Sequence, residues 1–364
     1  MTGTSAAAGR PDDDVKAQRA LRRRVLFKRI GAGASLLLVA VALVVLWRVF
    51  GEMDPAEVQA AFFRAGGARE VGLAAFFAAL SYLFLTGYDV VAMRGLGVKV
   101  PYRTTALGSF TSFAISFNLG FPLVTAGTVR YWIYSAKGVK ASNIARLTVI
   151  GGVTFWLGMS TVLGAGLLFN GEALARVDGL SPVLNRLVGA AVLATIAAYV
   201  VWISLHRPSV TIQGWRLTLP GPRVTIGQML LGVGDVCAGA AVLYVLLPDD
   251  VGFGFPTFAA IYAVACMIGV LSHAPGGIGV FEATILLAMP WLPRESVLGS
   301  LLLFRLLYYV APFIVALVLL GMHELARRRR SRRVRVGTAS AVAPPAPPDS
   351  FQQRAERERS IAGE

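Results

Sequence analysis

Six ionisable side chains fall inside segments that are otherwise long apolar runs. An unpaired charge in hydrocarbon costs several kcal/mol, so residues of this kind mark ion pairs, polar pathways or binding sites. Three are acidic and three are basic, and this equal count predicts a polar seam of buried ion pairs between helices. The six residues are Asp89, Arg130, Arg146, Asp235, Glu282 and Arg305.

Two interpretations of this seam stay open. The pairs either fix only the register of the helices, or at least one of Arg130, Glu282 and Arg305 contacts a substrate. Arg305 lies well inside the last apolar run, so it should pair with a buried carboxylate or with a phosphate. Arg146 and Asp89 lie near the ends of their runs, where a side chain can also reach the interface or water.

A proline and three glycines break the apolar run around residue 275, and a carboxylate follows them. A broken helix at membrane depth is tolerated only where it is buried or lines a polar cavity. Free N–H groups at the start of a new half-helix near Gly279 favour a phosphate-sized anion, and the other glycines let a headgroup approach the backbone. Glu282 either contacts that substrate or caps the half-helix. The predicted site residues here are Pro275, Gly276, Gly277, Gly279 and Glu282.

A second break lies within residues 104–134, at Asn118, Gly120 and Pro122. Basic residues flank this segment on both sides, which predicts a re-entrant hairpin that enters and leaves by the same face. A single kinked crossing is the alternative. Asn118, Arg130 and Tyr131 are the candidate site residues of this segment.

Short similarities between the two halves of the chain indicate an internal repeat. Residues 88–92 (YDVVA) resemble 234–238 (GDVCA), and the Asn-Leu-Gly break resembles the Ala-Pro-Gly break. Paired broken segments in two halves are typical of transporter sites.

The elements that must position these residues are membrane helices. The chain has 364 residues, 55% hydrophobic and 15% charged, with a mean hydropathy of +0.64, which excludes a soluble domain of this size. We therefore predict an all-α polytopic bundle of eight crossings plus the re-entrant hairpin. The predicted crossings are 30–50, 71–93, 147–169, 184–205, 226–247, 257–271, 280–291 and 297–322. A short strand hairpin or a surface strand is expected in the connection that follows residue 206.

Positive charge concentrates at the two ends. Residues 1–30 carry eight Lys or Arg against three Asp, and residues 327–364 carry ten Arg against four acids. This pattern predicts a basic cytoplasmic segment 1–29, a transmembrane domain 30–325 and a disordered Ala/Pro-rich cytoplasmic tail 326–364. Basic ends of this kind hold anionic lipid headgroups, and no folded element for reading nucleic acid accompanies them.

Several stretches together resemble one family. These are SFNLGFPLVTAGTVRYWIYSAKG (116–138), FWLG (155–158) and LSHAPGGIGVFEATIL (271–286). The chain resembles the transmembrane flippase domain of lysylphosphatidylglycerol synthases and related flippase-like membrane proteins over most of 30–325. The resemblance implies a bacterial inner-membrane protein that moves a lipid between leaflets, with Arg130, Tyr131 and residues 275–282 as motif residues. A soluble aminoacyltransferase domain is not expected, so the lipid substrate stays open.

Three classes of function compete. The leading hypothesis is a flippase-like transporter of a phospholipid, with an anionic phospholipid as its expected partner. The second is a non-transporting membrane partner of a lipid- or glycan-synthesising enzyme. The third, an intramembrane lipid-phosphate enzyme, is disfavoured because the three histidines lack the spacing of a metal site and no nucleotide-binding loop occurs. We therefore expect no enzyme activity, no cofactor and no metal, and the sequence does not indicate an oligomeric state.

Overall fold

The computed structural model describes residues 67–119, 122–206, 209–212, 215–218, 221–249, 251–272, 275–341 and 356–360, with single residues at 56, 60 and 63. Two compact units divide the chain, Met1–Ala316 and Leu317–Glu364. The first unit contains the helices that bear the candidate site. The predicted crossing 30–50, the segment 1–29 and much of the tail lie outside the described residues.

Long apolar helices form the frame of the protein. Within the described residues, five helices are long and apolar enough to cross a membrane. They are α3 (Ala68–Gly95), α6 (Ala141–Phe169), α8 (Pro182–His206), α9 (Pro222–Tyr244) and the continuous helix Arg294–Arg327. The last consists of α12 (Arg294–Phe304), the π-helical turn η2 (Arg305–Val310) and the start of α13 (Ala311–Ala341). The predicted helical membrane bundle is confirmed.

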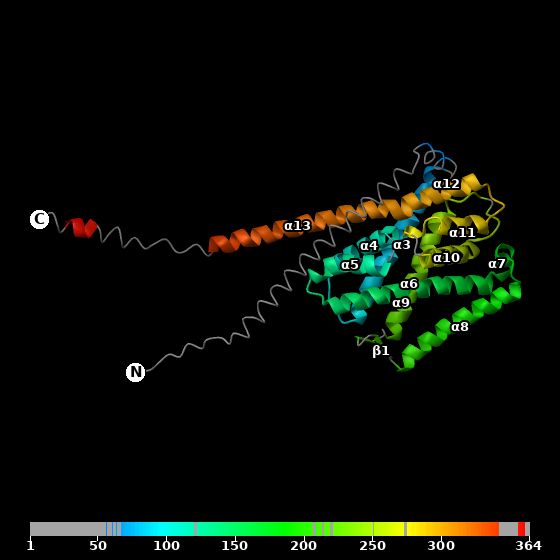
Figure 1. Ribbon diagram of the computed structural model, residues 1–364, viewed down its shortest axis with the longest axis horizontal. Helices are drawn as coiled ribbons and strands as arrows, with labels where there is room; N and C mark the ends of the chain where they lie inside the picture. The colour runs from blue at the N-terminus through cyan, green and yellow to red at the C-terminus, as the bar shows by residue number, and fades with distance from the viewer. Residues whose placement is uncertain are drawn as a thin grey trace. The chain divides into compact units, whose positions relative to one another are not determined.

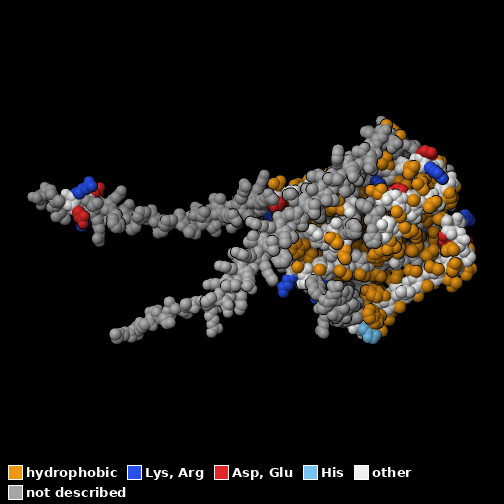
Figure 2. Space-filling model, viewed as in Figure 1, with side chains coloured by type: hydrophobic (Ala, Val, Ile, Leu, Met, Phe, Trp, Pro, Cys, Tyr) orange, Lys and Arg blue, Asp and Glu red, His pale blue; other side chains and the backbone are white. Residues whose placement is uncertain are grey.

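Apolar side chains also cover the outside of this bundle. Figure 2 shows hydrophobic atoms over much of the visible face. Large apolar side chains of α8, among them Leu187, Trp202 and Leu205, are exposed. A surface of this kind is stable against lipid and unfavourable in water.

The helix ends follow local sequence signals. α3 begins after Gly67, which has a φ of 90°, and carries Glu70 in its first turn and Arg94 in its last turn. Both charges complement the helix dipole. Pro222 occupies the first turn of α9, where its missing N–H costs nothing.

Residues 102–135 form a helical hairpin. Its arms are α4 (Tyr102–Leu119) and α5 (Pro122–Ser135), which pack against each other. The Tyr134 hydroxyl near the end of α5 donates to the Thr105 carbonyl near the start of α4, at 3.1 Å. A single kinked crossing would place these two residues at opposite ends, so the segment is a helical hairpin; its re-entry by the same membrane face stays a prediction. We call this the first hairpin.

A second hairpin contains the proline-glycine break. Its arms are α10 (Phe255–Leu271) and α11 (Val280–Ala288), joined through the 3-10 turn η1 (Pro275–Gly277). Trp291, just after α11, donates from Nε1 to the Val251 carbonyl just before α10, at 3.2 Å. This hydrogen bond therefore joins the start of α10 to the end of α11, at the end of the hairpin opposite its tip.

This second hairpin changes the interpretation of two predicted crossings. The nine residues of α11 extend about 13 Å, less than half of the roughly 30 Å of hydrocarbon. Segments 257–271 and 280–291 are therefore arms of one hairpin, and the count of eight crossings is not confirmed. Hydropathy along the sequence did not predict the second hairpin, because two short apolar arms have the same pattern as two short membrane spans.

The two hairpins meet at their tips. A Cβ built on Gly276 of the second hairpin would lie 3.3 Å from the Phe117 carbonyl oxygen of the first. The order α3, first hairpin, α6 is followed by α9, second hairpin, α12, and α3 packs against α9 (Figure 1). Residues 88–92 lie on α3 and residues 234–238 on α9, and the internal repeat stays a prediction.

Two smaller elements complete the unit. The short helix α7 (Gly171–Asp178) connects α6 to α8, and these two long helices lie side by side (Figure 1). Strands β1 (Ser209–Ile212) and β2 (Trp215–Thr218) pair antiparallel between α8 and α9, so the expected strand hairpin is confirmed.

Candidate functional site

Asp89 and Arg130 form a fully enclosed ion pair between α3 and the first hairpin. Arg130 donates from Nε and Nη2 to the two carboxylate oxygens of Asp89, at 3.0 and 2.8 Å. The Tyr134 hydroxyl donates to the same carboxylate at 2.6 Å, and the guanidinium lies over the Phe113 ring. The side chains of Arg130 and Asp89 are 2% and 0% exposed. This bidentate pair joins α5 to α3.

Glu282 and Arg305 form a second pair between the second hairpin and η2. Arg305 donates from Nε to Glu282 Oε1 at 2.7 Å, and its Nη2 lies 2.6 Å from the same oxygen. The other carboxylate oxygen, Oε2, accepts from the Gly279 backbone N–H at 2.7 Å. The predicted cap at the start of α11 is therefore present, and it occurs together with the ion pair. These side chains are 20% and 13% exposed, more than those of the first pair.

Arg305 also holds the tip of the second hairpin. Its Nη1 donates to the Gly276 carbonyl at 2.6 Å, and its guanidinium lies over the rings of Tyr309 and Phe281. On the first hairpin, Asn118 Nδ2 donates to the Tyr309 carbonyl at 3.2 Å. Both hairpin tips are thus tied to the same π-helical turn.

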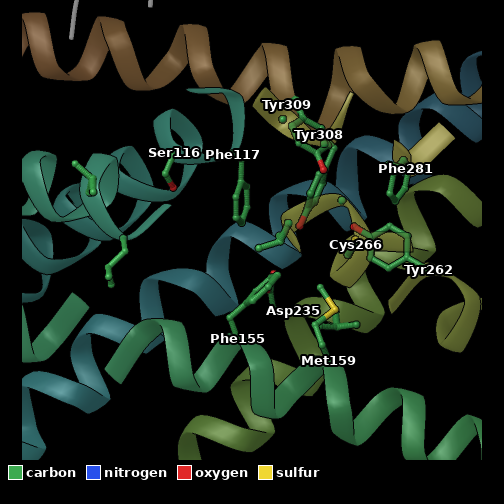
Figure 3. Close-up of a pocket in the computed structure, with 17 residues that line it drawn as sticks. Ser116, Phe117, Phe155, Met159, Asp235, Tyr262, Cys266, Phe281, Tyr308 and Tyr309 are labelled. Carbon is green, nitrogen blue, oxygen red and sulfur yellow. The ribbon is translucent and has the colours of Figure 1, made fainter. Parts of the chain in front are cut away.

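A cavity of about 390 Å³ lies between the two tips. It is bounded by both hairpins, α6, α9 and η2, and most of its wall is aromatic or apolar (Figure 3). Its aromatic side chains are Phe117, Phe155, Tyr262, Phe281, Tyr308 and Tyr309. Gly276 and Gly277 bring the backbone of the second tip to its edge, with φ of 62° and 64°. A space of this size lies in the range of small-molecule binding sites, which are mostly apolar with a few polar groups.

Asp235 is the one charged residue among those that line this cavity. Its side chain is buried and accepts from the Ser81 hydroxyl at 2.5 Å and from the Tyr88 hydroxyl at 3.1 Å. Ser81 is in turn 2.7 Å from the Tyr308 hydroxyl. Among the described residues, no Lys or Arg forms an ion pair with Asp235. The predicted polar seam therefore consists of two ion pairs and one carboxylate held by hydroxyl groups.

The remaining predicted site residues lie at the edges of this arrangement. Tyr131 is exposed on α5 although its neighbour Arg130 is buried, and Gly279 is an exposed cap position. Arg146 is half-buried near the start of α6, as its position in the sequence suggests. Pro275 begins η1.

Several cavity residues were not predicted from the sequence. Tyr262, Cys266 and Met159 look like ordinary core residues, since nothing in an apolar run distinguishes a wall from a core. Ser81 gave no signal either, because hydroxyl groups are common in membrane helices. Phe155 and Phe281 fall within the stretches that carry the family resemblance, which was the one available signal.

Comparison with known proteins agrees with this resemblance. A family model described as the lysylphosphatidylglycerol synthase TM region matches residues 35–316. The uncharacterized protein slr0712 of Synechocystis is 34% identical, over 72% of this chain and 81% of the relative. The inner membrane protein YbhN of Escherichia coli is 31% identical, over 70% of this chain and 80% of the relative.

A more distant similarity links the chain to a named enzyme. The phosphatidylglycerol lysyltransferase of Staphylococcus aureus is 28% identical over 66% of this chain, and the match covers only 28% of that enzyme.

Proposed function

Because this membrane protein belongs to the family of lysylphosphatidylglycerol synthase transmembrane regions, we propose that it moves phospholipid headgroups between the two leaflets through the cavity at the hairpin tips. One observation carries the proposal: two hairpins meet tip to tip around a cavity of about 390 Å³ that holds a buried carboxylate. Backbone breaks at membrane depth and a polar group inside the bundle support a headgroup pathway.

In this proposal, the headgroup passes between the tips while the acyl chains stay in the bilayer. The broken backbone at Gly276 and Gly277 gives the headgroup hydrogen-bonding groups that lipid does not offer. The apolar outer surface of the helices offers the chains a continuous apolar environment (Figure 2). The cost of carrying a polar headgroup through hydrocarbon is thereby lowered.

Arg305 is the proposed phosphate-binding residue. It already binds a carboxylate and a carbonyl beside the cavity, and a lipid phosphate offers the same acceptor chemistry. When the phosphate takes the place of the Gly276 carbonyl, the tip of the second hairpin is released. Glu282, Asn118 and the glycines of the tip complete this site in the proposal, whereas Asp89 and Arg130 hold the first hairpin in place.

The proposed setting follows the charge distribution. We place the protein in a bacterial inner membrane with both termini cytoplasmic and with residues 30–325 as the transmembrane domain. Anionic phospholipid at the inner surface is the proposed partner of the basic ends. The open end of the first hairpin then faces the cytoplasm and that of the second faces outward.

Reconstitution tests this function. Purified protein is placed in vesicles with fluorescent phospholipids that carry anionic, zwitterionic or lysyl-modified headgroups, and leaflet redistribution is measured. We expect faster redistribution than in empty vesicles, and loss of most of the increase in Arg305→Gln. The matched control is Arg186→Gln, which removes a pair with Glu172 that is 49% and 76% exposed.

Two outcomes would count against the proposal. Redistribution no faster than in empty vesicles for every headgroup would contradict lipid transport. Headgroup cleavage or exchange in the same vesicles would instead indicate an enzyme. Removal of residues 327–364 should leave redistribution unchanged, whereas loss of an enzyme partner on that truncation would favour a membrane adaptor.

A further inference from the structure

We propose that Asp235 is a proton-binding site and that headgroup passage is coupled to its protonation. The inference rests on the proposed function for its second half only, since proton binding can be measured without lipid movement. The buried carboxylates of the protein differ in whether a positively charged group lies beside them.

The other two intramembrane carboxylates are neutralised by arginine. Asp89 receives two hydrogen bonds from Arg130, and Glu282 receives one from Arg305 and one from a helix N-terminus. Each of these two carboxylates therefore has an arginine guanidinium as its counter-charge. Asp235 is buried like Asp89, yet its hydrogen-bond partners among the described residues are the uncharged hydroxyls of Ser81 and Tyr88. An ionised carboxylate without a counter-charge at this depth is unfavourable, and a bound proton removes its charge.

The hydroxyl groups around Asp235 suit both charge states. When the carboxylate is ionised, Ser81 donates to Oδ1 and Tyr88 donates to Oδ2. Ser81 and Tyr308 share a hydrogen bond in which either oxygen can be the donor. When Asp235 is protonated, it can donate to Ser81, which then donates onward to Tyr308. The Asp235 carboxyl and the Ser81 hydroxyl thus keep hydrogen-bond partners in both states, without a change of backbone.

The groups that face Asp235 from each packed element are uncharged at neutral pH. They are Tyr82 and Tyr88 from α3, Cys237 on α9 itself, Tyr262 and Cys266 from α10, and Tyr308 and Tyr309 from η2. From α6 the cavity receives Phe155 and Met159, which do not titrate. The two nearby ion pairs are each neutral overall. Asp235 is therefore the group in this cavity that changes charge.

A proton fits this site better than a metal cation does. A cation would need several oxygen lone pairs directed at it, whereas both hydroxyls here direct protons at the carboxylate. Asp235 also lies within the unbroken helix α9, so its own backbone carbonyls are engaged in the helix. No group of three or more metal-ligating side chains occurs among the described residues.

Protonation of Asp235 would remove the negative charge that a lipid phosphate meets in the cavity. A phosphate that enters beside an ionised Asp235 meets repulsion, and a phosphate beside the protonated acid does not. The protonated state therefore admits the headgroup, and loss of the proton to water on one side favours its release. This gives the lipid movement a dependence on pH that the ion pairs alone would not produce.

Infrared difference spectroscopy tests the proton site directly. The full-length protein in vesicles is titrated, and the carbonyl stretch of a protonated carboxyl group is followed. We expect this band to appear as pH falls, to disappear in Asp235→Asn, and to return in Asp235→Glu. The control Glu172→Gln removes an exposed carboxylate and should leave the band intact. Size-exclusion profiles establish that each variant is folded.

Lipid redistribution measured across the same pH range separates the two claims. We expect the wild-type rate to change with pH and the Asp235→Asn rate to stay constant. A band that persists in Asp235→Asn, or one that depends on sodium, would overturn the proton site while leaving lipid transport intact. The expected band without any lipid movement would instead contradict the proposed function and the coupling.

Discussion

At the residue scale, the two arginines of the site differ in what they hold. Arg130 makes its hydrogen bonds and its ring contact with groups of α3 and of the first hairpin, whereas Arg305 contacts a carboxylate, a hairpin carbonyl and two aromatic rings beside the cavity. The two pairs also differ in burial: the Asp89–Arg130 pair is fully enclosed, whereas the Glu282–Arg305 pair is partly exposed. The first pair is thus suited to fixing structure, and the second to responding to a ligand.

Removing one partner of the enclosed pair should destabilise the protein. In Asp89→Asn the Arg130 guanidinium stays buried without its counter-charge, and we expect a loss of about 3–5 kcal/mol of stability. Asp89→Asn combined with Arg130→Gln removes both charges and should recover part of that loss. Thermal unfolding in detergent measures both variants. Glu172→Gln is the exposed comparison, with an expected effect below about 1 kcal/mol. Equal effects at Glu172 and Asp89 would argue against a structural role for the enclosed pair.

At the element scale, the hairpin tips depend on backbone conformations that favour glycine. Gly276 and Gly279 both have positive φ, 62° and 85°, but only Gly276 lies against the opposite hairpin. This difference separates the strain of a substitution from its effect on the contact between tips.

Gly276→Ala and Gly279→Ala should therefore differ in transport. Each places a Cβ at a positive φ, at a cost of about 1–2 kcal/mol. Only at Gly276 does the new Cβ approach another group, the Phe117 carbonyl at 3.3 Å. We expect Gly276→Ala to lose most lipid redistribution and Gly279→Ala to retain most of it. Similar activity in the two variants would show that the contact between tips is not needed.

Helices α6 and α9 approach each other through glycine. A Cβ on Gly158 of α6 would lie 2.6 Å from the backbone of Gly232 on α9. Gly158→Ala should force these helices apart and cost about 1–3 kcal/mol in thermal unfolding. Gly152→Ala, on the same helix with no neighbour within 4 Å, should be neutral or slightly stabilising. A neutral Gly158→Ala would mean that the helices can separate without loss of packing.

At the scale of the whole molecule, the two hairpins give each half of the chain a matching order. A long helix with an aspartate precedes each hairpin, and the tips meet inside the bundle. Inverted repeats of transporters have such an order, and the proposed orientation, with one hairpin open to each side of the membrane, would agree with it.

Cysteine labelling tests this orientation. In a background with Cys237 and Cys266 replaced, Lys137→Cys marks the open end of the first hairpin and Arg294→Cys marks that of the second. Both positions are exposed. We expect a membrane-impermeant maleimide to label Arg294→Cys on intact cells, and Lys137→Cys only after permeabilisation. Labelling of both from the same side would contradict the opposed hairpins.

Much of this architecture was predictable from composition and from the breaks in the apolar runs. Asn118 and Pro122 with flanking basic residues predicted the first hairpin, because charge stays on one side of a membrane. The second hairpin was taken as two crossings, since a pair of short apolar arms and a pair of short spans share one hydropathy pattern. Its length relative to the bilayer became decisive once the contact from Trp291 to Val251 was known.

The sequence by itself determined that this is a helical membrane protein, where its helices break and which charges lie in hydrocarbon, because hydrophobicity, glycine and charge act locally along the chain. Only the tertiary structure decided the partners. Asp89 pairs with Arg130, and Glu282 pairs with Arg305. Asp235 accepts hydrogen bonds from hydroxyl groups of α3 and lines the cavity. The physical reason is distance: Asp235 and Ser81 are 154 positions apart, and only the packing of α3 on α9 brings them into contact.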